Sequence, residues 1–110
     1  MHPESPGAAP DERLAVLVRW QADGFDRPAA RVVATETARR LAHVPGLVEA
    51  RFFGDFDSGT HYYLLTWHDR AAMDAYMASE DMFGIRAIAQ PYAVGRPERS
   101  ICSDYSAPGA

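Results

Sequence analysis

The chain has 110 residues and a formal net charge of −4, which allows a single domain with a modest core. Its cationic side chains are all arginines and are spread along the sequence, so neither a nucleic-acid partner nor an anionic membrane surface is indicated. No apolar run approaches the ~20 residues of a membrane span, and the single cysteine, Cys102, excludes an internal disulfide. We therefore expect a cytoplasmic protein. Because Lys and Asn are absent, mechanisms that require either residue are also excluded.

Both ends of the chain lack the apolar residues that a core needs. Residues 1–12 contain three prolines, and residues 106–110 are small or polar. Such segments cannot bury enough apolar surface to become ordered. We therefore expect two frayed tails, 1–12 and 106–110, on either side of one folded domain over residues 13–105.

The first half of this domain predicts a strand followed by a helix. Residues 14–20 form a β-branched, apolar run that ends at a turn. Pro28 suits the first turn of a helix, and apolar residues continue at 3.6-residue spacing to about His43. Pro45-Gly46 then ends the helix.

The second half adds a hairpin before its helix. Residues 47–56 and 60–67 are predicted strands, and the turn between them contains Asp, Ser and Gly. Asp69 suits the N-cap of a second helix. A break around residues 79–81 separates this helix from a further helical piece over Met82–Ala89. Residues 96–105 form the last predicted strand.

Two strand–helix–strand units of this kind predict an α+β, ferredoxin-like βαββαβ fold. Its four-stranded antiparallel sheet would carry the helices on one face. The strands at 14–20 and 60–67 are apolar on both faces, and the helices can cover only one of them. Because an apolar sheet face needs a cover, we expect a second copy of the chain to supply it. The predicted assembly is a homodimer.

Three short motifs stand out along this framework. They are Val44-Pro45-Gly46-Leu47, Tyr62-Tyr63-Leu64-Leu65-Thr66-Trp67 and Ala71-Ala72-Met73-Asp74-Ala75-Tyr76. Together they resemble the antibiotic biosynthesis monooxygenase (ABM) family over about residues 14–105. The resemblance implies a dimeric α/β barrel, and for some members it implies oxidation of anthrone-type polyketides without metal or flavin. Other proteins of this architecture cyclise polyketides or have no known chemistry.

The resemblance also indicates which positions correspond to the pocket of the anthrone oxidases. Their strand-end Trp corresponds to Trp67, and their pocket Arg corresponds to Arg86. At three other polar positions this chain differs from them. Tyr63 stands where they have Asn, Phe53 where they have His, and Met73 where they have Tyr.

Most candidate catalytic residues share one face of the strand at 60–67, because odd-numbered side chains alternate onto it. We expect Trp67 to stack on a planar substrate and Tyr63 or His61 to accept its proton. Arg86 would pair with the resulting oxyanion. Each residue also has a structural interpretation: strand aromatics often belong to a core, His61 can be solvated beside the hairpin turn, and Arg86 can form a surface ion pair.

A second set of residues is predicted to bind the substrate in a pocket between the sheet and the interrupted helix. These residues are Phe53, Leu65, Met73, Tyr76, Met82 and Phe83. Ordinary packing is the alternative, since Met and aromatic side chains are more often core residues. By alternation Phe53 faces away from Phe52 and Phe56, so one of these two sides contributes to the core and the other to the dimer interface.

Metal binding is not indicated, because no His–carboxylate spacing resembles a metal-ligand set. His61 and His68 are an odd number of residues apart and would point to opposite faces of their strand. Cys102 is expected to be a small, buried residue of the last strand. We therefore expect neither a metal nor an organic cofactor.

The pattern as a whole predicts a cofactor-independent monooxygenase of secondary-metabolite biosynthesis, acting on a planar phenolic, anthrone-like or polyketide intermediate. Two alternatives use the same pocket. One is a polyketide cyclase or isomerase without oxygen chemistry, and the other is a non-catalytic ligand-binding accessory protein. The three differ in whether oxygen is consumed and whether any product forms.

Overall fold

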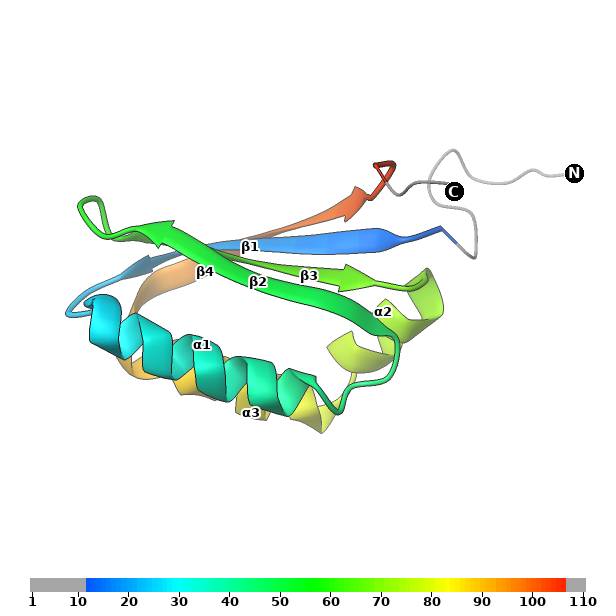
Figure 1. Cartoon of the computed structure of the whole chain (residues 1–110), viewed down its shortest axis with the longest axis horizontal. Helices are drawn as coiled ribbons and strands as arrows, with labels where there is room; N and C mark the ends of the chain where they lie inside the picture. Colours follow the sequence, from blue (N-terminus) through cyan, green and yellow to red (C-terminus); the bar gives the residue numbers. More distant parts are fainter. Residues whose placement is uncertain (1–11, 107–110) are drawn as a thin grey trace, which may run out of the picture.

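Strands and helices follow one another in the order expected of two strand–helix–strand units (Figure 1). The computed structural model describes residues 12–106, so the predicted tails lie almost wholly outside the described residues. The elements are β1 (Leu14–Ala22), α1 (Arg27–Leu41), β2 (Leu47–Asp55), β3 (Thr60–Trp67), α2 (Arg70–Met77), α3 (Glu80–Ala89), the 3₁₀ helix η1 (Gln90–Tyr92) and β4 (Ala93–Ser103).

The strands form one four-stranded sheet in the order β2-β3-β1-β4, and every neighbouring pair is antiparallel. All three α-helices lie on the same side of this sheet (Figure 1). On the other side, residues 12–106 provide no further layer (Figure 1). The predicted α+β, ferredoxin-like fold is therefore confirmed.

The core lies between the sheet and the helices. Side chains alternate along each strand, so the cross-strand row Ala50–Leu65–Val16 points toward the helical layer. The buried apolar residues are Leu14, Val16, Val18, Leu41, Leu65, Trp67, Met73, Tyr76, Met82 and Ile85. Every second residue from Leu14 to Val18 is therefore buried, as the alternation of apolar residues predicts. In β3 the inner-face residues His61, Leu65 and Trp67 are buried, and Thr66 is buried as well.

The helices begin where capping residues place them. Asp26 precedes α1, and its side-chain oxygen accepts a hydrogen bond from the N–H of Ala29 at 3.0 Å. Asp69 caps α2 in the same way through the N–H of Ala72 at 2.9 Å. α3 begins at Glu80, earlier than predicted, because acidic residues in the first turn interact favourably with the helix dipole.

β4 is an edge strand, and all of its residues are exposed. It begins at Ala93 rather than at residue 96. Gly95 adopts a φ of +72° near its start, and the register of pairing with β1 shifts in the same region. Because the strand lies at the edge, Cys102 is exposed. The expectation that Cys102 is buried is therefore wrong for this chain.

The sheet face that the helices leave uncovered is partly apolar. Phe53 and Tyr62 stack there with ring centroids 5.6 Å apart, and 49% of Phe53 is exposed. Leu17 and Leu64 lie opposite each other on the same face. This outer face therefore has the apolar character from which a covering partner is expected.

Gly46, in the turn between α1 and β2, cannot easily be replaced for two reasons. Its φ of +82° is a conformation that residues with a Cβ rarely adopt. A Cβ at this position would also lie 2.3 Å from the Cβ of Ala72 in α2. The carbonyl of Gly46 accepts a hydrogen bond from the N–H of His68 at 2.8 Å. The turn is thereby held against the link between β3 and α2.

Gly46→Ala should destabilise the protein more than Gly24→Ala, which is the matched control. Gly24 has a similar φ of +66°, but its Cβ would meet nothing within 4 Å. The left-handed backbone should lower the free energy of unfolding of both variants by about 1–2 kcal/mol. Overpacking should lower that of Gly46→Ala by a further ~1–3 kcal/mol. Urea unfolding followed by circular dichroism measures both free energies. Equal values for the two variants would contradict the close contact with Ala72.

Candidate active site

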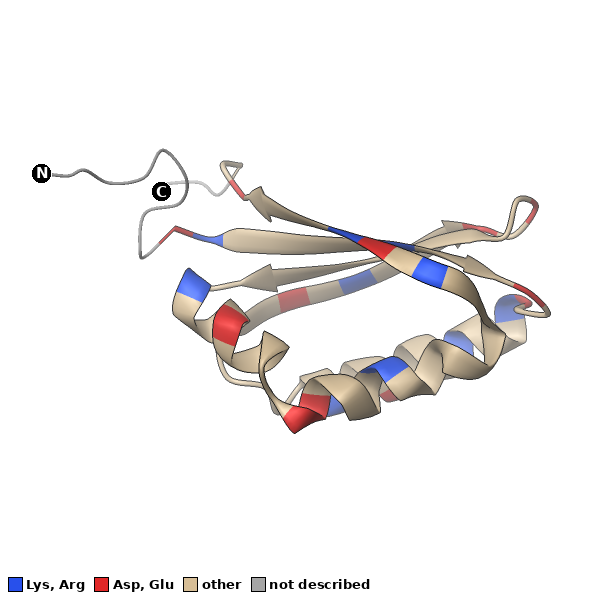
Figure 2. Cartoon of the chain, turned by 180° about the vertical axis from the view of Figure 1, so that it is seen from behind, with Lys and Arg blue, Asp and Glu red and all other residues tan. Residues whose placement is uncertain are grey.

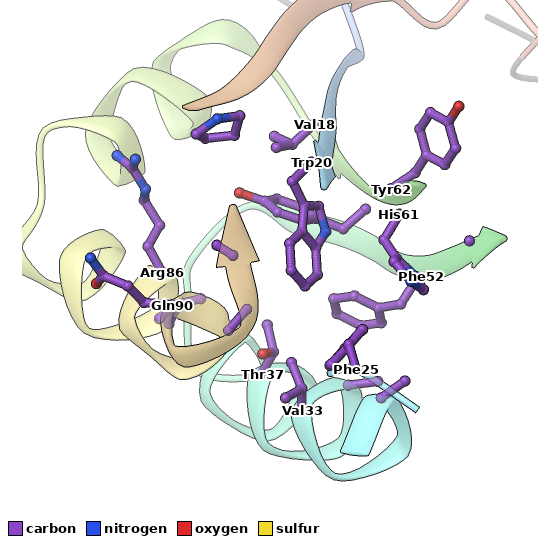
Figure 3. Close-up of a pocket in the computed structure, with 18 of the residues that line it drawn as sticks. Val18, Trp20, Phe25, Val33, Thr37, Phe52, His61, Tyr62, Arg86 and Gln90 are labelled. Carbon is purple, nitrogen blue, oxygen red and sulfur yellow. The ribbon is translucent and has the colours of Figure 1, made fainter. Parts of the chain in front are cut away.

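A cleft of about 680 Å³ lies between the inner face of the sheet and the helices α1 and α3. β1, β2 and β3 form one wall, while α1 contributes small side chains such as Ala34 and Thr37. Figure 3 shows many of the side chains that line it. A concave, largely apolar cavity of this size with a few polar groups is typical of a small-molecule site.

His61 lies at one end of this cleft among aromatic side chains. Its ring centroid is 4.9 Å from that of Phe25, 5.0 Å from Phe56 and 5.6 Å from Trp20. Only 5% of His61 is exposed. Burial lowers the pKa of His61 below its ordinary value, and the carboxylate of Asp55 opposes this shift only in part. The imidazole is therefore neutral at pH 7 and able to accept a proton.

Gly54 of β2 makes room for this histidine. It lies directly opposite His61 in the pairing of β2 with β3. A Cβ at position 54 would lie 2.1 Å from Nδ1 of His61 and 2.7 Å from its Cγ. The imidazole therefore occupies the space that a side chain at position 54 would fill, and any larger residue would displace it.

Two tyrosines supply hydroxyl groups farther along the cleft. Burial raises the pKa of Tyr63, and the positive charges of Arg86 and Arg99 oppose this shift. Burial also raises the pKa of Tyr76 to about 12. Both phenols are therefore protonated at neutral pH and can donate hydrogen bonds to a bound molecule.

Arg86 extends from α3 on the side of the cleft opposite His61 (Figure 3). It forms no ion pair with any residue in the range 12–106, so the surface ion pair considered above is not made within the described chain. A guanidinium without a partner, beside an apolar cleft, is suited to bind an anionic group.

Most of the predicted site residues line this cleft. They are Phe53, His61, Tyr63, Leu65, Tyr76, Phe83 and Arg86. Phe53 does so only from the margin, because its ring stacks on Tyr62, which is directed away from the cleft (Figure 3). Phe83 is 65% exposed. Met82 is buried and lines a second, adjoining cleft.

Trp67 and Met73 are not where the sequence analysis places them, since neither lines a cleft. Trp67 is 0% exposed, and its ring lies 5.1 Å from that of Tyr76. Its Nε1 has no hydrogen-bond partner among the described residues. Met73 belongs to the same buried cluster. The physical reason is that α2 follows β3 directly, so its buried face covers the end of the strand. Both residues therefore pack in the core.

The three aromatic residues around His61 were not assigned to the site from the sequence. Trp20, Phe25 and Phe56 surround His61 and form the most aromatic part of the cleft. Trp20 could have been assigned to the cleft from the sequence, because alternation places it on the same face of β1 as Val16 and Val18. Phe25 follows the end of β1, where alternation makes no prediction. Alternation placed Phe56 on the same side as Phe52, which also lines the cleft, but did not decide whether that side faces the core.

Within residues 12–106, no group of His, Cys, Asp or Glu side chains is arranged to hold a metal ion. In the same range, no helix is both long enough and apolar enough to cross a bilayer. Charged residues of both signs are distributed over the helices and strands (Figure 2).

Comparison with solved structures finds several proteins that share this fold. No protein-family profile matches the chain, and no curated protein does. SnoaB, a cofactor-independent oxygenase from Streptomyces nogalater, is similar in structure, with a TM-score of 0.70 and 17% identity over 90% of this chain and 99% of SnoaB. Rv0793 from Mycobacterium tuberculosis has a TM-score of 0.68 and 15% sequence identity, and the match covers 88% of this chain and 99% of Rv0793. A protein described as an antibiotic biosynthesis monooxygenase has a TM-score of 0.65 and 16% sequence identity, and the match covers 83% of this chain and 97% of that protein.

These similarities are structural, because the sequence identities are low. They cover nearly the whole of each solved chain. The fold of this protein is therefore the fold of the antibiotic biosynthesis monooxygenases, as the three motifs predict. What the chain does within that fold has to be argued from its own cleft.

The pKa of His61 should be lower in the native protein than in urea, where it should return to about 6.5. Titration of the imidazole C–H signals by NMR measures both values, and His61→Gln identifies the signal. Because the unfolded state then binds the proton more tightly, the free energy of unfolding should fall as the pH drops below about 6.5. His61→Gln should weaken this dependence. A native pKa equal to or above the unfolded value would contradict the burial of the imidazole.

Proposed function

We propose that this protein is a cofactor-independent oxygenase that oxidises a planar phenolic or anthrone-like polyketide intermediate in secondary-metabolite biosynthesis. The observation that carries the proposal is a neutral His61 among aromatic rings, with Arg86 on the opposite side of the same cleft. The fold supports it, because SnoaB has the same fold and is described as a cofactor-independent oxygenase.

The first step is removal of a proton from the substrate. A flat ring system bound in the cleft would contact the rings of Trp20 and Phe25. His61 accepts the proton from the acidic C–H or phenolic O–H group. Arg86 stabilises the oxyanion that forms, and the hydroxyl of Tyr63 can donate a hydrogen bond to it. The aromatic side chains around His61 limit the access of water to this anion.

The second step transfers electrons from the substrate anion to dioxygen. One electron passes to oxygen, and the two radicals combine to form a C–O bond. The resulting peroxide takes the proton back from His61. Loss of the remaining C–H proton and of hydroxide then leaves a carbonyl group. An anthrone CH₂ group and O₂ thus become a quinone C=O group and water, and the substrate supplies every electron.

A polyketide cyclase or isomerase is the second candidate, and Tyr63 is the observation that favours it. The ABM resemblance places Tyr63 where the anthrone oxidases have Asn. Burial raises the pKa of Tyr63, so its hydroxyl can donate to a substrate carbonyl while His61 removes a proton elsewhere. A non-catalytic accessory protein would use the same cleft to hold such a molecule without converting it.

We also propose that a second copy of the chain covers the outer face of the sheet. Leu17, Leu64 and the Phe53–Tyr62 stack form an exposed apolar surface there, and such surfaces on soluble proteins commonly mark interfaces. Leu64→Asp should therefore shift a dimer toward monomer in sedimentation velocity experiments. A monomeric wild-type protein at micromolar concentration would contradict the proposed assembly.

With 1,8-dihydroxyanthrone as substrate, the purified protein should consume oxygen. His61→Gln and Arg86→Gln should each lower kcat by about 100-fold or more, because they remove the general base and the oxyanion partner. Arg70→Gln is the control, since Arg70 lies on α2 outside the cleft and pairs with Asp74. The rate should rise as the pH increases through the lowered pKa of His61, because only the neutral imidazole accepts a proton.

The same assay separates the three candidate functions. If anthrones and hydroquinones consume oxygen no faster with the protein than in buffer alone, the oxygenase proposal is contradicted. Turnover of a polyketide substrate in the absence of oxygen would identify a cyclase or isomerase. Tight binding of a coloured aromatic compound with no product under either condition would identify an accessory protein.

A further inference from the structure

A second cleft of about 530 Å³ opens beside the first. Its walls come from the inner face of β1 and β3, from α2 and α3, and from β4. The residues that line both clefts are Val18, Tyr63, Leu65, Tyr76, Arg86, Arg96 and Pro97. Because the two clefts share these residues, they adjoin each other: the aromatic end of the first lies near His61, and the second extends to β4.

The end at β4 is lined by arginines. Arg96 and Arg99 lie on β4, and Arg86 lies across from them on α3. None of the three forms an ion pair with another residue in the described chain. Arg99 instead contacts a neutral atom, the Sδ of Met77, at 3.9 Å. These guanidinium groups are therefore available to a bound anion.

No acidic side chain among the described residues lines either cleft, although the chain contains 15 Asp and Glu residues. Glu98, between the two arginines of β4, pairs instead with Arg19 at 2.9 Å. Asp81 at the start of α3 is close enough to raise the pKa of Tyr76 but does not line the space. A protein with a net negative charge thus keeps one cavity positively charged, which attracts anions into it.

These charges affect the pKa of Tyr63, which lines both clefts. The positive charges of Arg86 and Arg99 both act to lower the pKa of Tyr63, against the larger effect of burial. Arginines from two different elements therefore act on the same point of the cavity. Their fork of N–H groups matches the geometry of a carboxylate, to which they can donate two parallel hydrogen bonds.

We propose that the natural substrate is an aromatic carboxylate. Its ring system lies at the His61 end, and its carboxylate is held by Arg96 and Arg99 at the β4 end. This inference rests on the proposed function for the ring site and adds the class of substrate. Arg96 and Arg99 act as specificity residues, because they bind a group distant from the atoms that react.

The test compares two probes of the same ring system and similar size, the anionic anthraquinone-2-carboxylate and the neutral anthraquinone-2-carboxamide. Neither is oxidised by the proposed chemistry, so binding is measured without turnover. By isothermal titration calorimetry the carboxylate should bind at least 10-fold more tightly than the carboxamide at low salt. The double variant Arg96→Gln/Arg99→Gln should bring the ratio close to one, while Arg70→Gln should leave it unchanged. Added NaCl should weaken binding of the carboxylate more than that of the carboxamide.

Equal affinities for the two probes, or no binding of either, would overturn the inference. A preference for the carboxylate that survives in the double variant would also overturn it, because other residues would then bind the acid. Both arginines are exposed, so the double variant should fold, and its thermal melting curve checks this. The outcomes for the two proposals are separable. Carboxylate preference without oxygen consumption rejects only the oxygenase, and oxygen consumption without the preference rejects only the anion site.

Discussion

The close approach of His61 to Gly54 is the contact on which the candidate site depends. In an antiparallel pair, directly opposed side chains occupy neighbouring space on one face, and the 2.1 Å separation from a hypothetical Cβ leaves no room for one. The glycine allows the imidazole to lie among Trp20, Phe25 and Phe56, which keep water away from it. The position of the imidazole, its burial and its lowered pKa therefore all depend on the absence of a side chain at position 54.

Those features that arise from local interactions could be predicted from the sequence. Asp69 caps its helix as expected, Pro45-Gly46 ends another, and β3 spans the residues predicted for it. Alternation also assigned His61, Tyr63 and Leu65 to the inner face of the sheet correctly. These features depend on residues close together in the chain, so they can be recognised without knowledge of the tertiary structure.

Features that depend on the packing of distant elements could not be predicted. Trp67 is on the expected face of β3, but alternation does not say how far along the strand the cavity ends, and α2 covers it. Cys102 is exposed because β4 lies at the edge of the sheet, which is a property of strand order. Phe25 reaches the site from the turn after β1, whose geometry carries no periodic signal.

The exposed edge strand β4 has a consequence for how such a protein can diversify. It contributes two arginines to the cavity but no buried residue to the core. Substitutions at exposed positions commonly change stability by only about ±0.5 kcal/mol, whereas changes around His61 would disturb packing. Substitutions on β4 can therefore change the lining of the clefts while the buried core and the surroundings of His61 stay intact, so that this part of the surface can vary in evolution at little cost to folding.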